Sequence, residues 1–302
     1  MRIIFSLLFI FILFFTSCGR KGKPLPPYSK TPMHITNIFS KQQGNNIFVI
    51  WNYNPTYDDG RPLKEFSFIV YKNDKPLNIE IHKAGNLYWF KHPIEDFNKE
   101  YCFYIVVKSK NKLSEPSKLT CIMPNRNFPP EPKLYSIKLR EEGLELNWSA
   151  DGDTVYIYKG NRDLILPIPK KKVENTGKYL DKSVALNKEY CYYITSSYTN
   201  SPESNPSNKL CKTFKDIFPP EPPYDFKMIK RKEGYYLIWS ESPSKDVIGY
   251  IIYKNGKPLF DIPIKTYYFI DKEYRPGDVY YIVAVDRAGN KSKKVYLEEI
   301  VE

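Results

Sequence analysis

The stretch Tyr101-Cys102-Phe103-Tyr104-Ile105 stands in a pattern that the chain repeats twice more. The other copies are Tyr190-Cys191-Tyr192-Tyr193-Ile194 and Asp278-Val279-Tyr280-Tyr281-Ile282. Alternating aromatic and β-branched residues are typical of β-strands that are buried on one face. The copies follow one another at intervals of about 90 residues. A repeat of that length, made of short strands broken by turns, predicts three tandem β-sandwiches.

Two earlier strands of each repeat show the same regularity. The first closes on a tryptophan, at Trp51, Trp148 and Trp239. The second ends in a Tyr-Lys pair, at Tyr71-Lys72, Tyr158-Lys159 and Tyr253-Lys254. The pairs Asn73-Asp74, Gly160-Asn161 and Asn255-Gly256 come directly after it. Because these residues accept a positive φ, each pair predicts a two-residue hairpin turn.

An early tryptophan followed by a late strand of the form Tyr-x-aromatic-x-aliphatic resembles the fibronectin type III module. The late-strand pattern is present at Tyr101-Phe103-Ile105 and at Tyr190-Tyr192-Ile194, whereas Asp278 replaces the first tyrosine in the third repeat. There the segment 284–290 is similar to the usual end of the family's module. The resemblance covers roughly residues 33 to 300. It implies an all-β chain of three immunoglobulin-like sandwiches.

Proline-rich segments separate the repeats. Phe128-Pro129-Pro130-Glu131-Pro132 and Phe218-Pro219-Pro220-Glu221-Pro222 match each other, and proline does not continue the interior of a sheet. The predicted organisation is a signal peptide (residues 1–17), a lipidated proline-rich tether (18–32) and three fibronectin type III-like modules (33–125, 126–215 and 216–302).

The N-terminus has the features of an export signal. A run from Ile3 to Phe15 is apolar apart from Ser6, and it is shorter than the roughly 20 residues that span a bilayer. The following Thr16-Ser17-Cys18 resembles the bacterial lipoprotein lipobox, with Phe15 where leucine is usual. The resemblance implies cleavage before Cys18, diacylation of its thiol and attachment to the outer membrane, facing the periplasm or the cell surface. The alternative is an uncleaved anchor, which the cations Arg20, Lys21 and Lys23 disfavour.

The other four cysteines occupy equivalent places in two repeats. Counting four residues on from Ser117, Ser207 and Ser292 gives Cys121, Cys211 and Tyr296, and Val279 stands where Cys102 and Cys191 do. The third repeat therefore lacks both cysteines, which predicts the disulfides Cys102–Cys121 and Cys191–Cys211 and an oxidising compartment. Cys102 is expected on the outward face. The alternatives are four free thiols or a Cys₄ zinc site.

The composition gives little support for catalysis or for metal or cofactor binding. The formal net charge is +12, with lysine clusters at residues 170–172 and 291–294, and we interpret it as a solvated surface or a weak preference for anionic lipid or wall polymer rather than nucleic acid. His34, His82 and His92 lack metal-ligand spacing. The acidic turns 58–60 and 151–153 offer too few oxygen ligands for Ca²⁺, and Trp89 is expected to pack within a sheet. We expect no catalytic residues, no cofactor and no metal.

Three functions remain open at this stage. The first is a membrane-anchored envelope lipoprotein that acts as a non-enzymatic protein-interaction or spacer scaffold, with an envelope protein as its partner. The second is a cell-wall or glycan-binding lipoprotein, for which the many aromatic residues and the positive charge speak. The third, an enzyme, is disfavoured because the sandwiches occupy the whole chain after the tether.

Overall fold

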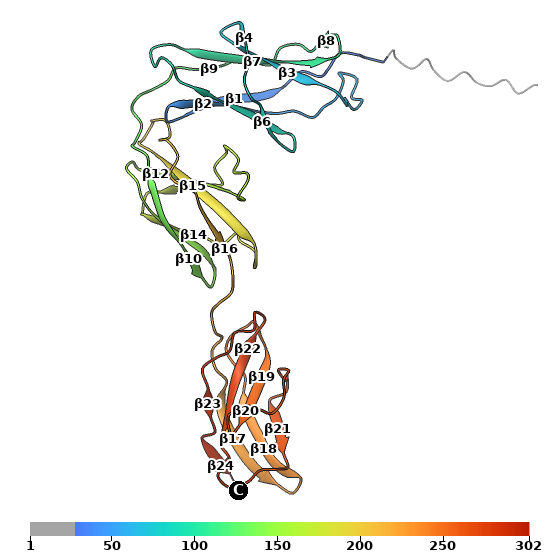
Figure 1. Cartoon of the computed structure of the whole chain (residues 1–302), viewed down its shortest axis with the longest axis vertical. Coiled ribbons are helices and arrows are strands. Elements are labelled where there is room, and N and C mark those ends of the chain that lie inside the picture. Colours follow the sequence, from blue (N-terminus) through green and yellow to red (C-terminus); the bar gives the residue numbers. More distant parts are fainter. Residues whose placement is uncertain (1–27, 302) are drawn as a thin grey trace, which may run out of the picture. The chain divides into compact units, whose positions relative to one another are not determined.

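The computed structural model describes residues 28–301, and these residues form strands, turns and loops without a helix (Figure 1). Cys18 and the predicted signal peptide lie outside the described residues. The chain divides into two compact units, of which one ends at Phe128 and the other begins at Pro129. The first unit holds one β-sandwich and the second unit holds two, each with its own core. The fold is therefore all-β, in tandem sandwiches of the immunoglobulin and fibronectin type III kind.

The first sandwich packs a sheet ordered β1-β2-β6-β5 against a sheet in which β4-β3-β7-β8 are neighbours and β9 also pairs with β7. The core between the sheets is built around Trp51, which is fully buried. The strands are β1 Asn37–Gln43, β2 Asn46–Asn52, β3 Ser67–Lys72, β4 Lys75–Leu77, β5 His82–Ala84, β6 Leu87–Pro93, β7 Tyr101–Ser109, β8 Lys112–Leu113 and β9 Thr120–Ile122.

The second sandwich packs a sheet ordered β10-β11-β14 against a sheet ordered β13-β12-β15-β16. Trp148 and Tyr192 contribute to its core. The strands are β10 Lys133–Arg140, β11 Gly143–Ser149, β12 Thr154–Gly160, β13 Lys171–Glu174, β14 Lys178–Asp181, β15 Glu189–Ser197 and β16 Leu210–Thr213.

The third sandwich packs a sheet ordered β21-β18-β17-β24 against a sheet ordered β20-β19-β22-β23. Trp239 and Tyr280 contribute to its core. The strands are β17 Tyr224–Arg231, β18 Gly234–Ser240, β19 Val247–Lys254, β20 Lys257–Pro258, β21 Tyr268–Asp271, β22 Tyr280–Asp286, β23 Val295–Tyr296 and β24 Glu299–Val301.

Two of the three predicted hairpin turns are present. Asn73 and Asp74 have φ values of 47° and 62°, and Asn255 and Gly256 have values of 52° and 79°. The prediction at Gly160-Asn161 is wrong, because neither residue has a positive φ. Asn161 Oδ1 instead accepts hydrogen bonds from the backbone N–H groups of Asp163 and Leu164, which opens a longer loop. The side-chain bonds of the asparagine thus outweigh the turn preference of the glycine.

The predicted equivalence of Tyr296 with Cys121 and Cys211 is also wrong. Tyr296 pairs with Tyr281, two residues beyond Val279 on β22. The reason is that Ser292 is equivalent to Ser114 and not to Ser117. Ser292 accepts the N–H of Ala284, as Ser114 accepts that of Val107, so the count of four residues from Ser292 starts too early in the chain. After Leu297, β24 pairs in parallel with β17 of the other sheet. The last strand of the third sandwich therefore crosses from one sheet to the other near the level at which the other two sandwiches carry a disulfide.

Candidate interaction surface

A stacked tyrosine pair lies at the same place in every sandwich, on the face of the second sheet that points away from the core. The pairs are Tyr71–Tyr104, Tyr158–Tyr193 and Tyr253–Tyr281, with ring centroids 4.7, 4.4 and 4.5 Å apart. In each pair the two residues stand directly opposite each other on neighbouring strands. We call this surface the outer face. Cross-strand aromatic pairs stabilise a sheet, so the pairs have a structural role before any other.

One strand position decides how polar each outer face is. Leu113, Glu203 and Lys291 each stand just before the serine whose hydroxyl oxygen accepts an N–H of the neighbouring strand. We call it the latch position. Leu113 pairs with Lys108, and Lys291 pairs with Val285, the residue equivalent to Lys108.

The three latch residues differ in the hydrogen bonds that they form with the tyrosine pair. In the second sandwich the hydroxyls of Tyr158 and Thr195 both donate to Glu203 Oε2, each at a distance of 2.5 Å. In the third sandwich Lys291 Nζ donates to the Tyr253 hydroxyl over 2.9 Å. Leu113 cannot form such a bond, and its side chain is 51% exposed. The outer face of the first sandwich therefore stays apolar where the other two are closed by a polar side chain.

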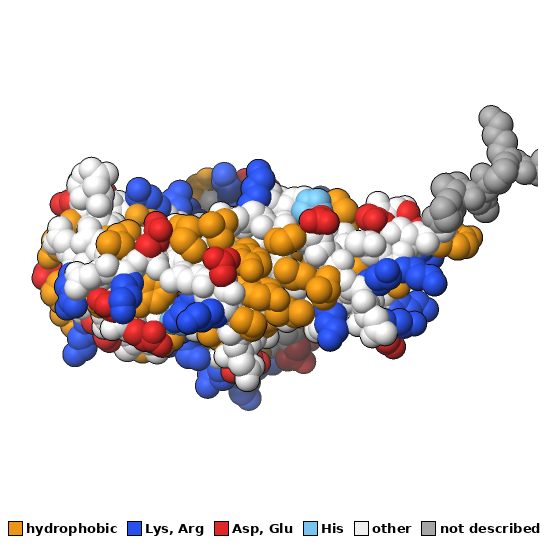
Figure 2. Space-filling model, turned by 90° about the horizontal axis from the view of Figure 1, so that it is seen from above, with side chains coloured by type: hydrophobic (Ala, Val, Ile, Leu, Met, Phe, Trp, Pro, Cys, Tyr) orange, Lys and Arg blue, Asp and Glu red, His pale blue; other side chains and the backbone are white. Residues whose placement is uncertain are grey.

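The first sandwich exposes this apolar face to solvent. Figure 2 looks onto it: hydrophobic side chains gather in the middle of the view, with a few Asp and Glu side chains among them and Lys and Arg side chains around them. Leu113 and Leu119 are 51% and 60% exposed, whereas Val106, on the same face of β7, is 7% exposed. Exposed leucines next to buried apolar residues of one face form a continuous apolar surface, which is a common mark of an interaction site.

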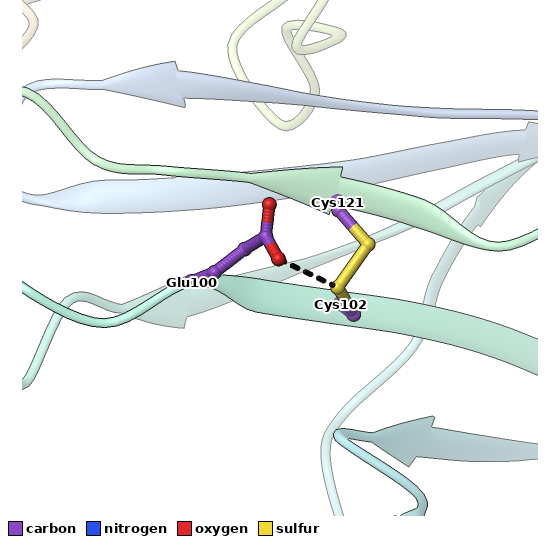
Figure 3. Close-up of side chains that lie close together, drawn as sticks. All are labelled: Glu100, Cys102 and Cys121. Atoms are coloured by element: carbon purple, nitrogen blue, oxygen red, sulfur yellow. Dashed lines mark hydrogen bonds between the residues drawn. A yellow bond between two sulfur atoms is a disulfide. The ribbon is translucent and has the colours of Figure 1, made fainter.

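The two predicted disulfides cross this face. Cys102 pairs with Cys121 and Cys191 with Cys211, and the members of each pair stand opposite each other in register. In Figure 3 the carboxylate of Glu100 lies beside the first disulfide, with one oxygen 3.7 Å from Sγ of Cys102. Glu189 lies in the same relation to the second disulfide. Because all four sulfurs are bonded, these two carboxylate–cysteine groups do not offer thiolate ligands to a metal.

The inner side of each second sheet holds a lysine, and the repeated Tyr-Lys pair was its signal in the sequence. Lys159 Nζ lies 2.8 Å from Asp181 Oδ2, which also accepts the Tyr192 hydroxyl over 2.7 Å. The third sandwich repeats the arrangement: Lys254 Nζ lies 2.8 Å from Asp271 Oδ2, and the Tyr280 hydroxyl donates to the same oxygen at 2.5 Å. The sequence reasoning missed these groups, because Asp181 and Asp271 lie on another strand far along the chain.

Both aspartates are held in their charged form. Burial alone would raise the pKa of Asp181, but hydrogen bonds from Lys159, Ser183 and Tyr192 outweigh it and lower the pKa below its usual value. Burial also raises the pKa of Tyr192, and the Asp181 carboxylate raises it further. The tyrosine therefore remains a neutral hydrogen-bond donor. This pattern matches a structural ion pair that keeps its charges satisfied within the sandwich.

The first sandwich fills the same position with histidine. His92 stands opposite Ile47 as Asp181 stands opposite Leu144, and Phe103 replaces Tyr192. Lys72 Nζ lies 3.1 Å from His92 Nε2 and 3.4 Å from a carboxylate oxygen of Glu95. Burial, followed by the charge of Lys72, lowers the pKa of His92. A histidine next to an ammonium group stays neutral, so this lysine lacks a buried counterion.

The third sandwich carries a polar cleft of about 610 Å³ near the start of β19. Lys245, Lys265 and Arg287 line it, together with Glu241 and Tyr267. The Tyr267 hydroxyl donates to Glu241 over 3.0 Å, and the tyrosine is 49% exposed. An exposed aromatic ring near three cations is suited to an acidic saccharide more than to an apolar ligand.

The other residues singled out from the sequence have structural contacts. Trp89 is 7% exposed and its ring stacks on His82. Asp59 accepts the N–H groups of Ser29 and Arg61. Asp153 accepts the N–H of Thr199.

A further group of carboxylates, Asp216, Asp246 and Asp286, lies together in the third sandwich and the segment before it. Asp286 already accepts both the N–H and the side-chain amide of Asn290. Three carboxylates are fewer than the six to eight oxygen ligands that Ca²⁺ takes. We assign no metal to them.

Comparisons with known proteins add little to this description. No protein-family model matches the chain, and no curated protein matches it in sequence. Among solved structures, the FN1–FN3 domains of chicken CNTN1 are similar to the chain at 15% identity, covering 89% of this chain and 99% of that one, with a TM-score of 0.26. The central fibronectin-III array of RIM-binding protein shows 12% identity, with 90% and 98% covered and a TM-score of 0.23. Likenesses this low carry no argument, so the fold assignment rests on strand order and register.

The class of protein that these observations define is a tandem array of fibronectin type III-like sandwiches. Its outer faces carry one stacked tyrosine pair each. No helix within residues 28–301 is long and apolar enough to cross a bilayer.

Proposed function

We propose that this protein is an envelope lipoprotein, anchored through Cys18, whose sandwiches act as a non-enzymatic scaffold or spacer that binds another envelope protein. The observation that carries the proposal is the tandem layout, in which each sandwich has a separate core and exposes side chains of its own. Fibronectin type III-like arrays suit such a role because binding resides in loops and sheet edges that a rigid sandwich positions. The proposed location is the outer membrane, facing the periplasm or the cell surface.

The buried carboxylates support a structural rather than a chemical role. Among residues 28–298, whose side chains the structure describes, these are Asp181, Glu203, Asp271 and Asp286. Each accepts hydrogen bonds from side chains or backbone of its own sandwich. A general acid or base must reach a substrate, and groups saturated in this way have no remaining geometry for it.

The anchor can be tested directly on protein purified from membranes. Mass spectrometry of the N-terminal peptide should find a chain that begins at Cys18 and carries acyl groups on its thiol. A chain that begins at Met1 without lipid would contradict the lipoprotein assignment. The two disulfides give an internal control, because their four cysteines should resist alkylation until a reductant is added.

The scaffold role predicts a specific partner. A photo-crosslinking residue placed at Tyr296, which is 54% exposed, or at Ile262, which is 77% exposed, should capture one envelope protein in intact cells. A matched placement at the fully buried Ile282 should capture none. Failure of a set of exposed positions across the sandwiches to capture any protein would count against a binding role and leave only a spacer.

The second candidate is a cell-wall or glycan-binding lipoprotein, and the cleft of the third sandwich favours it. Co-sedimentation with peptidoglycan or an acidic cell-surface polysaccharide should decrease for the variant Tyr267→Ala with Lys265→Ala. Tyr268→Ala provides a control, because Tyr268 is exposed to a similar degree and does not line the cleft. Sedimentation that modest salt abolishes for every variant would indicate charge alone.

A further inference from the structure

The first sandwich carries a cluster of lysines and leucines at one end of its outer face. Lys108 lies at the end of β7, Lys110 in the turn, Lys112 and Leu113 in β8, and Lys118 and Leu119 just before β9. All six side chains are exposed. We call this set the basic leucine surface. None of its four lysines forms an ion pair with residues 28–298, whose side chains the structure describes, so four charges face solvent beside two exposed leucines.

We propose that the basic leucine surface docks on an anionic lipid surface. Leucines among lysines have the composition of interfacial segments, in which apolar side chains enter the headgroup region and cations meet lipid phosphates. The long lysine stems can lie along apolar surface while the ammonium groups reach outward. A protein-binding centre is instead depleted in lysine and enriched in tyrosine, tryptophan and arginine. The charge and composition therefore favour lipid as the occupant.

The course of the chain places this surface close to the proposed anchor. The Ser29 N–H donates to Asp59 over 2.8 Å, and the Arg61 guanidinium lies 4.3 Å above the Tyr28 ring, which ties the first described residues to the segment between β2 and β3. Ser109, the last residue of β7 and the neighbour of Lys108 and Lys110, donates from its hydroxyl to the carbonyl of Glu65 in the same segment. Tyr28, Ser29 and the basic leucine surface thus lie at one end of the sandwich.

The length of the tether sets how far this end can lie from a membrane. From Cys18 to Tyr28, ten residue steps of at most about 3.5 Å reach roughly 35 Å. If the anchor of the proposed function holds, Tyr28 stays within that distance of lipid headgroups, and the basic leucine surface lies at the same end of the sandwich as Tyr28. The distance argument rests on the proposed function, whereas the composition argument does not.

The second sandwich shows that the fold does not require such a surface. Its corresponding stretch, residues 197–203, contains no lysine or arginine and ends in Glu203, the equivalent of Leu113. Glu203 is 8% exposed and accepts the hydroxyls of Tyr158 and Thr195. Both sandwiches have the same pair of central strands in this sheet, β3–β7 and β12–β15, and the same serine bond. The lysines and leucines of the first sandwich are thus additions to a common framework.

The test measures vesicle binding by the body alone. A chain of residues 19–302 lacks the acylated cysteine and keeps every core residue, since the first of them is Ile35. It should co-sediment with vesicles of phosphatidylcholine mixed with phosphatidylglycerol and much less with phosphatidylcholine alone. Binding should weaken as salt is raised, because the attraction is screened. Equal binding to neutral vesicles, or no binding to anionic ones, would overturn the proposal and leave the lipoprotein assignment untouched.

Variants with matched controls then locate the contact. Lys108→Glu with Lys110→Glu and Lys112→Glu should lower partitioning at least about tenfold, since each lysine near an anionic surface contributes roughly fivefold. Lys170→Glu with Lys171→Glu and Lys172→Glu changes the net charge equally in the second sandwich and should have a small effect. Equal losses for both triple variants would show a response to net charge alone and would refute the basic leucine surface.

The leucines are tested separately. Leu113→Ser with Leu119→Ser should weaken binding at unchanged charge, while Leu186→Ser with Ile217→Ser removes apolar side chains of similar exposure from the second unit and should not. An unchanged disulfide pattern and circular dichroism spectrum would show that each variant is folded. If the leucine pair has no effect, the contact is electrostatic only and the proposed docking of an apolar surface is wrong.

Discussion

The first and second sandwiches share their central strands and carry a disulfide at the same place, but they differ at two positions, one on the inner and one on the outer side of the second sheet. On the inner side, Lys72 meets His92 where Lys159 meets Asp181. On the outer side, Leu113 stands where Glu203 binds the tyrosine pair. At these two positions the second sandwich satisfies its polar groups internally, whereas the first leaves a lysine without a buried counterion and an apolar face without a polar side chain over it. A common framework can therefore be specialised by two side chains without a change of topology.

The largest effect is expected when the counterion of Lys159 is removed from the second sandwich. Asp181→Asn removes the buried carboxylate from the half-buried Lys159 and should lower the free energy of unfolding by up to about 3 kcal/mol, the lower end of the range for breaking a fully buried pair. Urea unfolding followed by hydrogen exchange of the second unit would measure the loss. Asp163→Asn, at an exposed loop position, should change it little. A loss below about 1 kcal/mol would show that the ion pair does not hold this core.

The disulfides should contribute equally to both sandwiches. They join residues 19 and 20 positions apart, and closing such loops stabilises by about 3 kcal/mol in the chain-entropy model. We expect two double variants to lower the free energy of unfolding of their own sandwiches by similar amounts. These variants are Cys102→Ser with Cys121→Ser and Cys191→Ser with Cys211→Ser. A clear difference between the two losses would mean that the neighbouring outer-face residues alter the contribution of the bond.

The latch position gives a smaller and asymmetric effect. Glu203→Leu gives the second sandwich the residue of the first and leaves the hydroxyls of Tyr158 and Thr195 without their acceptor, at a cost of about 1–3 kcal/mol. The reverse change, Leu113→Glu, replaces an exposed side chain and should stay within about 0.5 kcal/mol of the original. Urea unfolding of both variants provides the measurement. Equal costs would contradict the idea that only the second sandwich uses this position as a latch.

The smallest expected effect is a difference in acid sensitivity. The folded pKa of His92 is lowered by burial and by Lys72, so the unfolded chain binds the proton more readily. The stability from neutral His92 is therefore complete above the unfolded pKa, about 6.5, and decreases as the pH falls through the folded pKa. The first unit should lose stability at mild acidity, where the second unit does not yet respond because the lowered pKa of Asp181 lies well below that range.

The variant His92→Gln provides the control for this pH dependence. It should remove most of the mild-acid loss from the first unit, since glutamine does not titrate, while hydrogen exchange in the second unit keeps its own profile. The charged groups around His92 are Lys72 and, through it, Glu95. If His92→Gln leaves the profile of the first unit unchanged, another group must be responsible for the acid response.

Much of the fold could be predicted because its signals are local and repeated. The recurring Trp51, Trp148 and Trp239 and the late-strand pattern identified three sandwiches, since alternation along a strand is set by which face is buried. Two turns were predicted from residues that tolerate a positive φ. The errors arose at Asn161 and Ser292, where a side-chain hydrogen bond, and not the spacing of residues, decides the backbone path. The candidate surface could be predicted only in part.

The sequence by itself determined the repeat, the paired cysteines and the composition of every strand, because each depends on the order of residues along one chain. Only the tertiary structure decided that Asp181 meets Lys159 and that Glu203 meets Tyr158. These partners belong to different strands, and their distance depends on register across a sheet and packing between sheets. For the same reason, the sequence alone could not distinguish Leu113 as an exposed position from an ordinary strand residue, since exposure depends on what the rest of the fold leaves uncovered.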